Sequence, residues 1–241
     1  MKYIVANWKC NPENRIEAKK ILLGYKKGIK KSLKIAAAVC PPACYLETAK
    51  EILKSAAGLG GQDCHWQNSG AFTGEISPTQ LRAAGCGYVI IGHSERRHIF
   101  GETDETINKK VKAALAAGLA PIFCCGETRG QRIDGKITDI VEAQIKEGLK
   151  DVDLNTAPVM IAYEPVWAIG TGLACEPDEA AVVSRFIKNI TNEKIPLLYG
   201  GSVNAKNAAS YLKDAGYSGL LVGGASLDPK EFCAIIASAK I

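Results

Sequence analysis

Four polar side chains with complementary chemistry follow short apolar runs at distant points of the chain. They are the carboxamide Asn7, the ammonium Lys9, the imidazole His93 and the carboxylate Glu164. A carboxylate and an imidazole can move protons to and from a substrate near neutral pH, and an ammonium stabilises negative charge that develops in the reaction. If the fold brings these side chains together, they are equipped for general acid–base catalysis.

Two glycine pairs occupy similar positions nearer the C-terminus. The segments are Gly200-Gly201-Ser202 and Gly223-Gly224-Ala225. Glycine lets the backbone approach an anion closely, and the N–H groups at the start of a helix can bind phosphate. Either pair alone could be only a tight turn. Two pairs after neighbouring strands favour a phosphate site.

The segment that follows Glu164 has too few polar residues for an ordinary surface loop. A core segment would explain this composition, but two glycines and the position next to the expected base favour a lid that excludes water from a reactive intermediate. The lid residues are Val166, Trp167, Ala168, Ile169, Gly170, Thr171, Gly172, Leu173, Ala174 and Cys175.

Eight short apolar runs, rich in β-branched or small residues, recur along the chain, and segments with helical periodicity separate them. Continuous apolar strands that alternate with helices predict a parallel sheet covered on its outer face. Eight units favour a closed (β/α)₈ barrel, although periodicity alone leaves an open doubly wound sheet as an alternative. The expected strands are Tyr3–Asn7, Ile35–Cys40, Leu59–Gln62, Tyr88–Ile91, Ala120–Cys124, Val159–Tyr163, Ile195–Tyr199 and Gly219–Val222.

Local signals mark where the expected helices begin and end. Ser77-Pro78 and Asp228-Pro229 each place a capping side chain before a proline in the first turn, and Gly118 follows a helical pattern as a C-terminal glycine does. In a barrel of this kind the active site lies at the C-terminal ends of the strands. All of the polar residues and glycine pairs above follow expected strands, so we expect them to share that end.

The composition is that of a globular protein. The chain has 241 residues, of which 47% are hydrophobic and 23% charged, and we expect one domain over residues 1–241. No run of about 18 apolar residues predicts a membrane span. The N-terminal residues become polar too soon for a secretory signal, so we expect a cytoplasmic protein.

The cysteines and lysines call for no special partner. The nine cysteines have spacings that suit neither a disulfide framework nor a zinc site, so we expect free thiols and no metal. The net charge of +5 is concentrated near the N-terminus, where residues 1–54 carry 12 Lys or Arg against 4 acids. Nucleic-acid binding is conceivable. A solvated helix face explains the lysines better, because they accompany an apolar stripe of Ala18, Leu22, Tyr25 and Ile29 at helical spacing.

A set of motifs in a fixed order resembles the triosephosphate isomerase family along essentially the whole chain. The most specific is Ala-Tyr-Glu-Pro-Val-Trp-Ala-Ile-Gly-Thr-Gly at residues 162–172. The others are Asn7-Trp8-Lys9, Cys40-Pro41-Pro42, Gly70–Ser77, Ile91–Arg97, Phe100-Gly101-Glu102-Thr103, Cys124-Cys125-Gly126-Glu127, Tyr199–Val203 and Leu221–Leu227.

The resemblance implies that the protein interconverts dihydroxyacetone phosphate and D-glyceraldehyde 3-phosphate, a glycolytic and gluconeogenic step, without a cofactor. Glu164 would move the carbon-bound proton, with Ile169 and Leu221 excluding water from its carboxylate. His93 would polarise the carbonyl as a neutral imidazole, Lys9 would stabilise the phosphate and the enediolate, and Glu95 could pair with Lys9. Substrate oxygens and phosphate would be bound by Asn7, Lys9, Gly170, Ser202, Gly223 and Gly224.

The family resemblance also implies a homodimer. The loop at residues 70–77 is long for a connection after a strand, and it places Phe72 and Ile76 on an expected protruding tip. In the family this loop inserts beside the partner's first active-site loop. The interface residues would be Cys10, Phe72, Thr73, Gly74 and Glu75. A mobile loop on a monomer is the alternative.

Other positions are expected to be structural or depart from the family pattern. His65 and His98 lie outside the motifs and should be solvated, while Cys124 and Glu127 should support the site without reacting. The lid ends in Leu173-Ala174-Cys175, where a lysine and small residues are usual, so Cys175 would place an oxidisable thiol at the hinge. Another sugar-phosphate isomerase or epimerase, and a non-catalytic phosphate-binding barrel used for interactions, are the rival functions.

Overall fold

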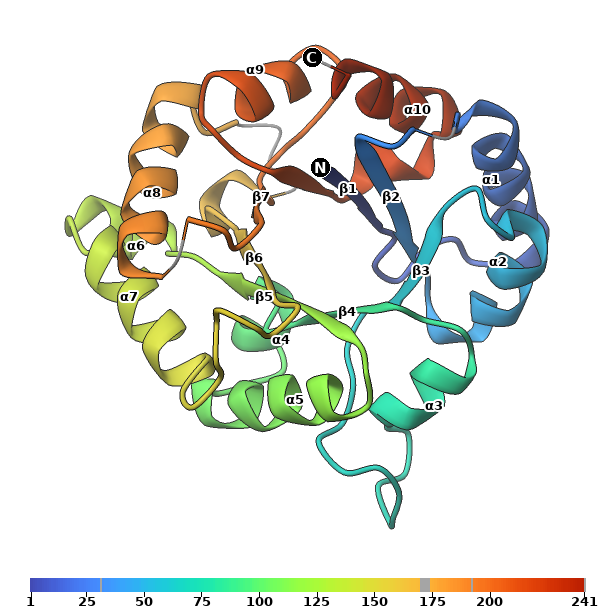
Figure 1. Cartoon of the computed structure of the whole chain (residues 1–241), viewed down its shortest axis with the longest axis horizontal. Helices are drawn as coiled ribbons and strands as arrows, with labels where there is room; N and C mark the ends of the chain where they lie inside the picture. Colours follow the sequence, from blue (N-terminus) through green and yellow to red (C-terminus); the bar gives the residue numbers. More distant parts are fainter. Residues whose placement is uncertain (31, 170–173, 192, 241) are drawn as a thin grey trace.

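The structure is a computed structural model that describes residues 1–30, 32–169, 174–191 and 193–240. Over these residues, eight parallel strands pair in chain order and close into a barrel, with β1 paired to β8. The helices surround the ring of strands (Figure 1). The predicted (β/α)₈ barrel is confirmed, and the open doubly wound sheet is excluded.

Every apolar run that was expected to be a strand is one, and the bounds differ by two residues at most. The strands are β1 (Lys2–Asn7), β2 (Ile35–Cys40), β3 (Gly58–Gly61), β4 (Tyr88–Ile91), β5 (Ala120–Cys125), β6 (Met160–Tyr163), β7 (Leu197–Tyr199) and β8 (Gly219–Val222). Tyr3 of β1 lies opposite Ala36 of β2 and Gly219 of β8, so the first strand joins both of its neighbours in register.

Apolar side chains of each strand divide between two clusters. Val5 belongs to a small cluster with Ile90, Ile122 and Leu198, whereas its neighbour Ile4 belongs to a large cluster that includes the buried faces of the helices. Successive side chains of a strand point to opposite faces. The small cluster therefore fills the barrel, and the large one lies between the strands and the surrounding helices.

The helices begin where capping signals predict. Ser77 forms a capping box with Gln80, the Asp228 side chain accepts from the Lys230 N–H, and Gly118 has φ 75° just after a helix. The helices are α1 (Arg15–Gly28), α2 (Leu46–Leu53), α3 (Pro78–Ala83), α4 (Ser94–His98), α5 (Asp104–Ala116), α6 (Arg129–Ile133), α7 (Ile137–Gly148), α8 (Pro177–Ile190), α9 (Ala208–Lys213) and α10 (Pro229–Ser238), with single turns η1 (Ala43–Tyr45), η2 (Val166–Ala168) and η3 (Gly224–Leu227).

Helix α1 confirms the interpretation of the N-terminal lysines. Ala18, Leu22, Tyr25 and Ile29 are buried. The lysines that share this stretch are exposed, namely Lys19, Lys20, Lys26, Lys27, Lys30 and Lys34. Within the described part of the chain, no helix is both long and apolar enough to cross a membrane.

Candidate active site

The residues singled out for chemistry line one cavity at the C-terminal ends of the strands. Asn7 and Lys9 follow β1, His93 follows β4, and Glu164 follows β6. The cavity has a volume of about 270 Å³, and its wall also contains Ile169, Ser202, Leu221, Gly223 and Gly224. The parallel direction of all the strands explains the convergence, because their carboxyl ends meet at the same end of the barrel.

Glu164 and His93 face each other inside this cavity, and both are almost completely buried. Their exposed fractions are 2% and 6%, and Glu164 Oε1 lies 3.3 Å from His93 Nε2. The other carboxylate oxygen accepts a hydrogen bond of 2.9 Å from the Ser94 N–H. A buried carboxylate requires such donors, since leaving one without a partner is costly.

The tautomer of His93 follows from its backbone contact. The Glu95 N–H donates to His93 Nδ1 at 3.2 Å, whereas the Glu95 carboxylate lies 3.8 Å away from the same nitrogen. A nitrogen that accepts a hydrogen bond carries no proton, so a neutral imidazole bears its proton on Nε2. His93 can therefore present an N–H donor to the cavity beside the Glu164 carboxylate.

Glycines make the space in which Glu164 lies. A Cβ atom on Gly126 would collide with the backbone carbonyl of Glu164, and a Cβ on Gly200 would lie 2.9 Å from Glu164 Cγ. Gly126 is a motif residue to which sequence reasoning gave no role of its own, and Gly200 was assigned to a phosphate turn. Both are required on steric grounds by the position of the expected base.

Lys9 is held in a conformation that is uncommon for a residue with a side chain. Its φ is 53°, its N–H donates to Asn7 Oδ1 at 3.0 Å, and Gln62 Nε2 donates to its carbonyl oxygen at 2.9 Å. Its ammonium lies 2.6 Å from Glu95 Oε1, which confirms the expected pairing. Sequence reasoning missed Gln62, although this residue sits at the C-terminal end of an expected strand and could have been found there.

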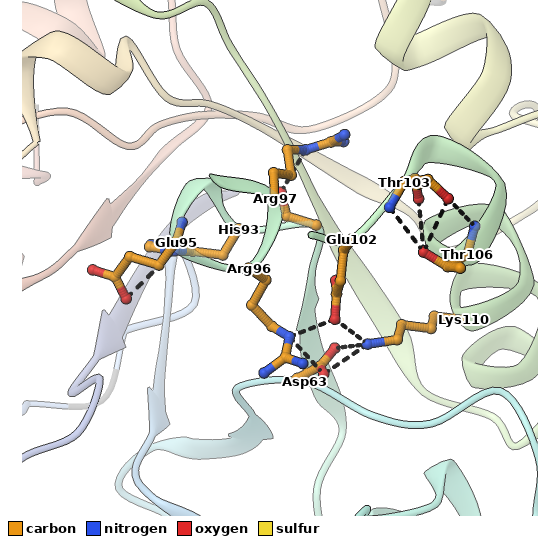
Figure 2. Close-up of polar contacts among 10 residues, drawn as sticks. Asp63, His93, Glu95, Arg96, Arg97, Glu102, Thr103, Thr106 and Lys110 are labelled. Atoms are coloured by element: carbon orange, nitrogen blue, oxygen red, sulfur yellow. Dashed lines mark hydrogen bonds and ion pairs between the residues drawn. The ribbon is translucent and has the colours of Figure 1, made fainter. Parts of the chain in front are cut away.

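Four charged residues, Asp63, Arg96, Glu102 and Lys110, form a cluster next to the segment that carries His93 and Glu95 (Figure 2). Arg96 Nε lies 2.9 Å from Asp63 Oδ2 and 2.5 Å from Glu102 Oε1, and Lys110 pairs with the same two carboxylates. Asp63 follows Gln62 in sequence, and Arg96 follows Glu95. The cluster therefore anchors the two backbone segments whose side chains hold Lys9.

The pKa values of the two carboxyl groups in this cluster, Asp63 and Glu102, are shifted in opposite directions. Burial, together with the nearby Glu102, raises the pKa of Asp63 to about 6, against the effect of Lys110 and Arg96. Burial also acts to raise the pKa of Glu102, but hydrogen bonds from Lys110 and Arg96 outweigh it and lower that pKa. In the folded protein, ionisation of Asp63 is therefore less favourable than ionisation of Glu102.

Three expectations for individual residues are wrong. His65 is not solvated but buried, with its ring 4.1 Å from that of Trp66 and 4.0 Å from that of Phe72. Ile76 is partly buried against the core and does not lie on the tip of its loop. The Cys175 thiol is fully buried, so it is poorly placed for oxidation, and burial raises its pKa to about 12.

Other expected positions agree with the structure or fall outside it. His98 is exposed, and Cys124 and Glu127 are fully buried. Glu127 accepts hydrogen bonds from the Tyr163 hydroxyl and the Trp167 indole at 3.0 and 2.9 Å. Gly170, Thr171, Gly172 and Leu173 of the expected lid lie outside the described residues. Among the residues that are described, no group of three or more His, Cys, Asp or Glu side chains could hold a metal ion.

The raised pKa of Asp63 predicts how Asp63→Asn changes stability with pH. Between about pH 4 and 6 the folded state holds a proton on Asp63 that the unfolded state has released, so the contribution of Asp63 to stability falls as pH rises. Asparagine cannot titrate, so the variant should gain unfolding free energy relative to wild type across this range and stay level above it. Urea unfolding at several pH values measures the difference. A constant difference would contradict the assignment, and Asp139→Asn, exposed on α7, is the control.

The close approach of Gly126 to the Glu164 backbone predicts that Gly126→Ala lowers both activity and stability. The added methyl must displace the Glu164 carbonyl, and a shift of about 1 Å in a catalytic group can cost on the order of 10²-fold in rate. Gly130→Ala is the matched control, because a Cβ there meets nothing within 4 Å. Turnover and the unfolding midpoint should both fall in the first variant, and neither should fall in the second. Normal turnover of Gly126→Ala would show that the base tolerates displacement.

Comparison with known proteins agrees with this geometry. A family model described as triosephosphate isomerase matches residues 2–239. The triosephosphate isomerase of Aquifex aeolicus (strain VF5) is 45% identical over 243 residues, which cover 98% of each chain. That of Endomicrobium trichonymphae is 44% identical over 98% of each chain. That of Synechocystis sp. (strain ATCC 27184 / PCC 6803 / Kazusa) is 44% identical over 97% of this chain and 96% of the relative. With the barrel, the site and these relatives in agreement along nearly the whole sequence, the chain belongs to the triosephosphate isomerase family.

Proposed function

We propose that this protein interconverts dihydroxyacetone phosphate and D-glyceraldehyde 3-phosphate through an enediolate. The observation that carries the proposal is the buried pair of Glu164 and His93, 3.3 Å apart in a cavity that also contains Lys9 and the glycine turns. This arrangement offers a proton acceptor, a neutral proton donor and a fixed cation to one small substrate. Family membership supports the same reaction.

In this mechanism Glu164 removes a proton from the carbon beside the carbonyl and returns it to the neighbouring carbon. His93 donates from Nε2 to the carbonyl oxygen and stabilises the charge that develops there, and it then moves protons between the two substrate oxygens. Ile169 and Leu221 line the same cavity and limit the access of water to the carboxylate. Lys9 supplies positive charge without giving up its proton, and Asn7 hydrogen-bonds substrate oxygens.

The phosphate of the substrate binds at the ends of β7 and β8. Ser202, Gly223 and Gly224 form this part of the cavity, and Gly223 and Gly224 stand at the start of η3. Ser202 is tied to the segment after Glu164, because its N–H and hydroxyl donate to the Ala168 carbonyl at 3.2 and 2.5 Å. Gly170, the remaining expected phosphate ligand, lies outside the described residues.

Residues 166–175 form a lid over the enediolate in this proposal. The described ends of the segment support it, since Ile169 lines the cavity and the Ala168 carbonyl holds Ser202. A lid of this kind protects the intermediate from losing its phosphate to water. The fraction of turnovers that release inorganic phosphate is therefore a measure of how well the segment is positioned.

Glu164→Gln tests the assignment of the base. Glutamine cannot accept the carbon-bound proton, so kcat should fall by at least about 10²–10⁴-fold, while a phosphate-containing substrate analogue should still bind. A coupled assay with glyceraldehyde 3-phosphate measures the first, and calorimetry measures the second. Glu142→Gln, on the outer helix α7, is the control and should keep wild-type turnover. Near-normal turnover of Glu164→Gln would refute the mechanism.

We also propose that the enzyme is a homodimer. The segment between β3 and α3 projects from the barrel (Figure 1), and its residues Phe72, Thr73, Gly74 and Glu75 are exposed. Beside Lys9 and the exposed Cys10 lies a cavity of about 540 Å³. Each subunit thus has both a projecting loop and a recess next to its active site. A two-fold pair would fill both recesses and hold each Lys9 in place.

Thr73→Arg tests the dimer. An arginine at the loop tip would not fit beside Lys9 and Cys10 of another subunit, so sedimentation should show a weakly active monomer at micromolar concentration. Thr138→Arg, at an exposed position on α7, introduces the same charge away from the loop and should leave the assembly unchanged. A fully active wild-type monomer of 25.7 kDa would contradict the proposal.

The remaining expectations form part of the same proposal. All nine cysteines are free, as expected in a reducing compartment such as the cytoplasm. The chain would act as one domain over residues 1–241, bind a triose phosphate, and need no cofactor, membrane or nucleic acid. Another sugar-phosphate isomerase or epimerase would fail the glyceraldehyde 3-phosphate assay, and a non-catalytic barrel would bind the phosphate without turnover.

A further inference from the structure

The guanidinium of Arg132 on α6 contacts residues at both ends of the segment 166–175. On one side, its Cζ lies 4.6 Å from the centre of the Trp167 ring. On the other, Nη2 lies 2.7 Å from Oε2 of Glu179 in the first turn of α8. Its Nη1 lies 3.5 Å from Oε1 of Glu127, which is fully buried between them.

The contact between Arg132 and Trp167 links Arg132 to the part of the cavity that would bind phosphate. The Trp167 indole donates to Glu127 Oε1 at 2.9 Å and carries Arg132 on its ring, so two neighbours fix its orientation. Trp167 lies in η2, and the next residue, Ala168, accepts hydrogen bonds from the Ser202 N–H and hydroxyl. A change in the orientation of Trp167 would therefore move a residue that lines the cavity.

The contact with Glu179 reaches the opposite end of the segment. Glu179 Oε2 lies 3.7 Å from the Cys175 sulfur and accepts from its thiol. The raised pKa of Cys175 keeps that thiol protonated, which its role as a donor requires. The Tyr211 hydroxyl donates to the Cys175 carbonyl at 2.7 Å and fixes the backbone there. Arg132 is thus linked to Cys175 through one carboxylate oxygen.

We propose that Arg132 is a positioning residue for the isomerase, which couples the two ends of segment 166–175 by binding Trp167 and Glu179 at the same time. The inference rests on the proposed function, and it adds a residue that touches no reacting atom. A guanidinium suits this task because its plane can stack on an indole while its edge binds a carboxylate. A lysine ammonium is a point charge and cannot do both in a fixed geometry.

Hydrogen exchange tests the coupling without relying on activity. The amides of Ala168 and Ile169 donate to Pro165 and Val166, and they report on the end of the segment that Glu179 does not touch. If Arg132 couples the two ends, Glu179→Gln should speed exchange in a peptide that covers residues 166–169 by about two- to fivefold, since Glu179 is half exposed. Arg132→Met should do so at least as strongly. Unchanged exchange there in Glu179→Gln would overturn the proposal.

Kinetics test what the coupling does. Arg132→Met and Glu179→Gln should each raise the KM for glyceraldehyde 3-phosphate and the fraction of turnovers that release inorganic phosphate. The double variant should match Arg132→Met alone, because both substitutions remove the same ion pair between Arg132 and Glu179. Arg132→Lys should recover only part of the loss. Arg129→Met, exposed on the same helix, is the control and should behave as wild type.

Hydrogen exchange and kinetics together test the coupling by Arg132 separately from the isomerase reaction. Additive effects in the double variant, or equal effects of Arg129→Met and Arg132→Met, would overturn the proposed coupling. If the wild-type protein does not isomerise triose phosphates, the proposed function fails, and the exchange experiment still decides whether Arg132 joins the two ends.

Discussion

The Glu164 carboxylate has lost nearly all of its water, and every other feature of the site follows from how that loss is compensated. One oxygen accepts from the Ser94 N–H, and the other faces the His93 imidazole. A buried carboxylate is stable only if the groups that contact it stay in place. The closed barrel provides this, because β4 and β6 are each locked between two other strands.

Lys9 presents the opposite problem, since its ammonium is partly solvated and its backbone is strained. The positive φ is maintained by hydrogen bonds with Asn7 and Gln62, and Gln62 directly precedes Asp63 of the partly buried cluster with Arg96, Glu102 and Lys110. Local strain of this kind persists only where the surroundings determine it. The cluster therefore helps to fix the direction in which Lys9 enters the cavity.

The sequence predicts the strands and the reacting residues well because both depend on local signals. Apolar runs become strands, and a polar residue directly after a run lies at the mouth of the barrel, as with His93 and Glu164. The same logic would have found Gln62. It could not have found the steric role of Gly126, which depends on a neighbouring strand, or the two contacts of Arg132, which depend on side-chain orientation.

The wrong expectations for His65 and Cys175 also arise from side-chain packing in the folded protein. His65 looks like a solvated residue in the sequence, but its ring is buried and packs against those of Trp66 and Phe72. Cys175 looks like a reactive thiol, but it is completely buried and contacts Glu179 of α8 and the Tyr211 hydroxyl. Burial of a single side chain in a loop is a non-local property, and periodicity carries no information about it.

Closure of the sheet by β1 and β8 also affects how the chain must fold as it is made. The outer edge of β1 pairs with residues 219–222, which leave the ribosome long after β1 does. Until then the nascent chain has an apolar parallel strand with unsatisfied backbone groups at each side of an incomplete sheet. Such edges are templates for pairing with other chains. A ring architecture that leaves no open edge in the finished barrel therefore exposes two edges while the chain is being made.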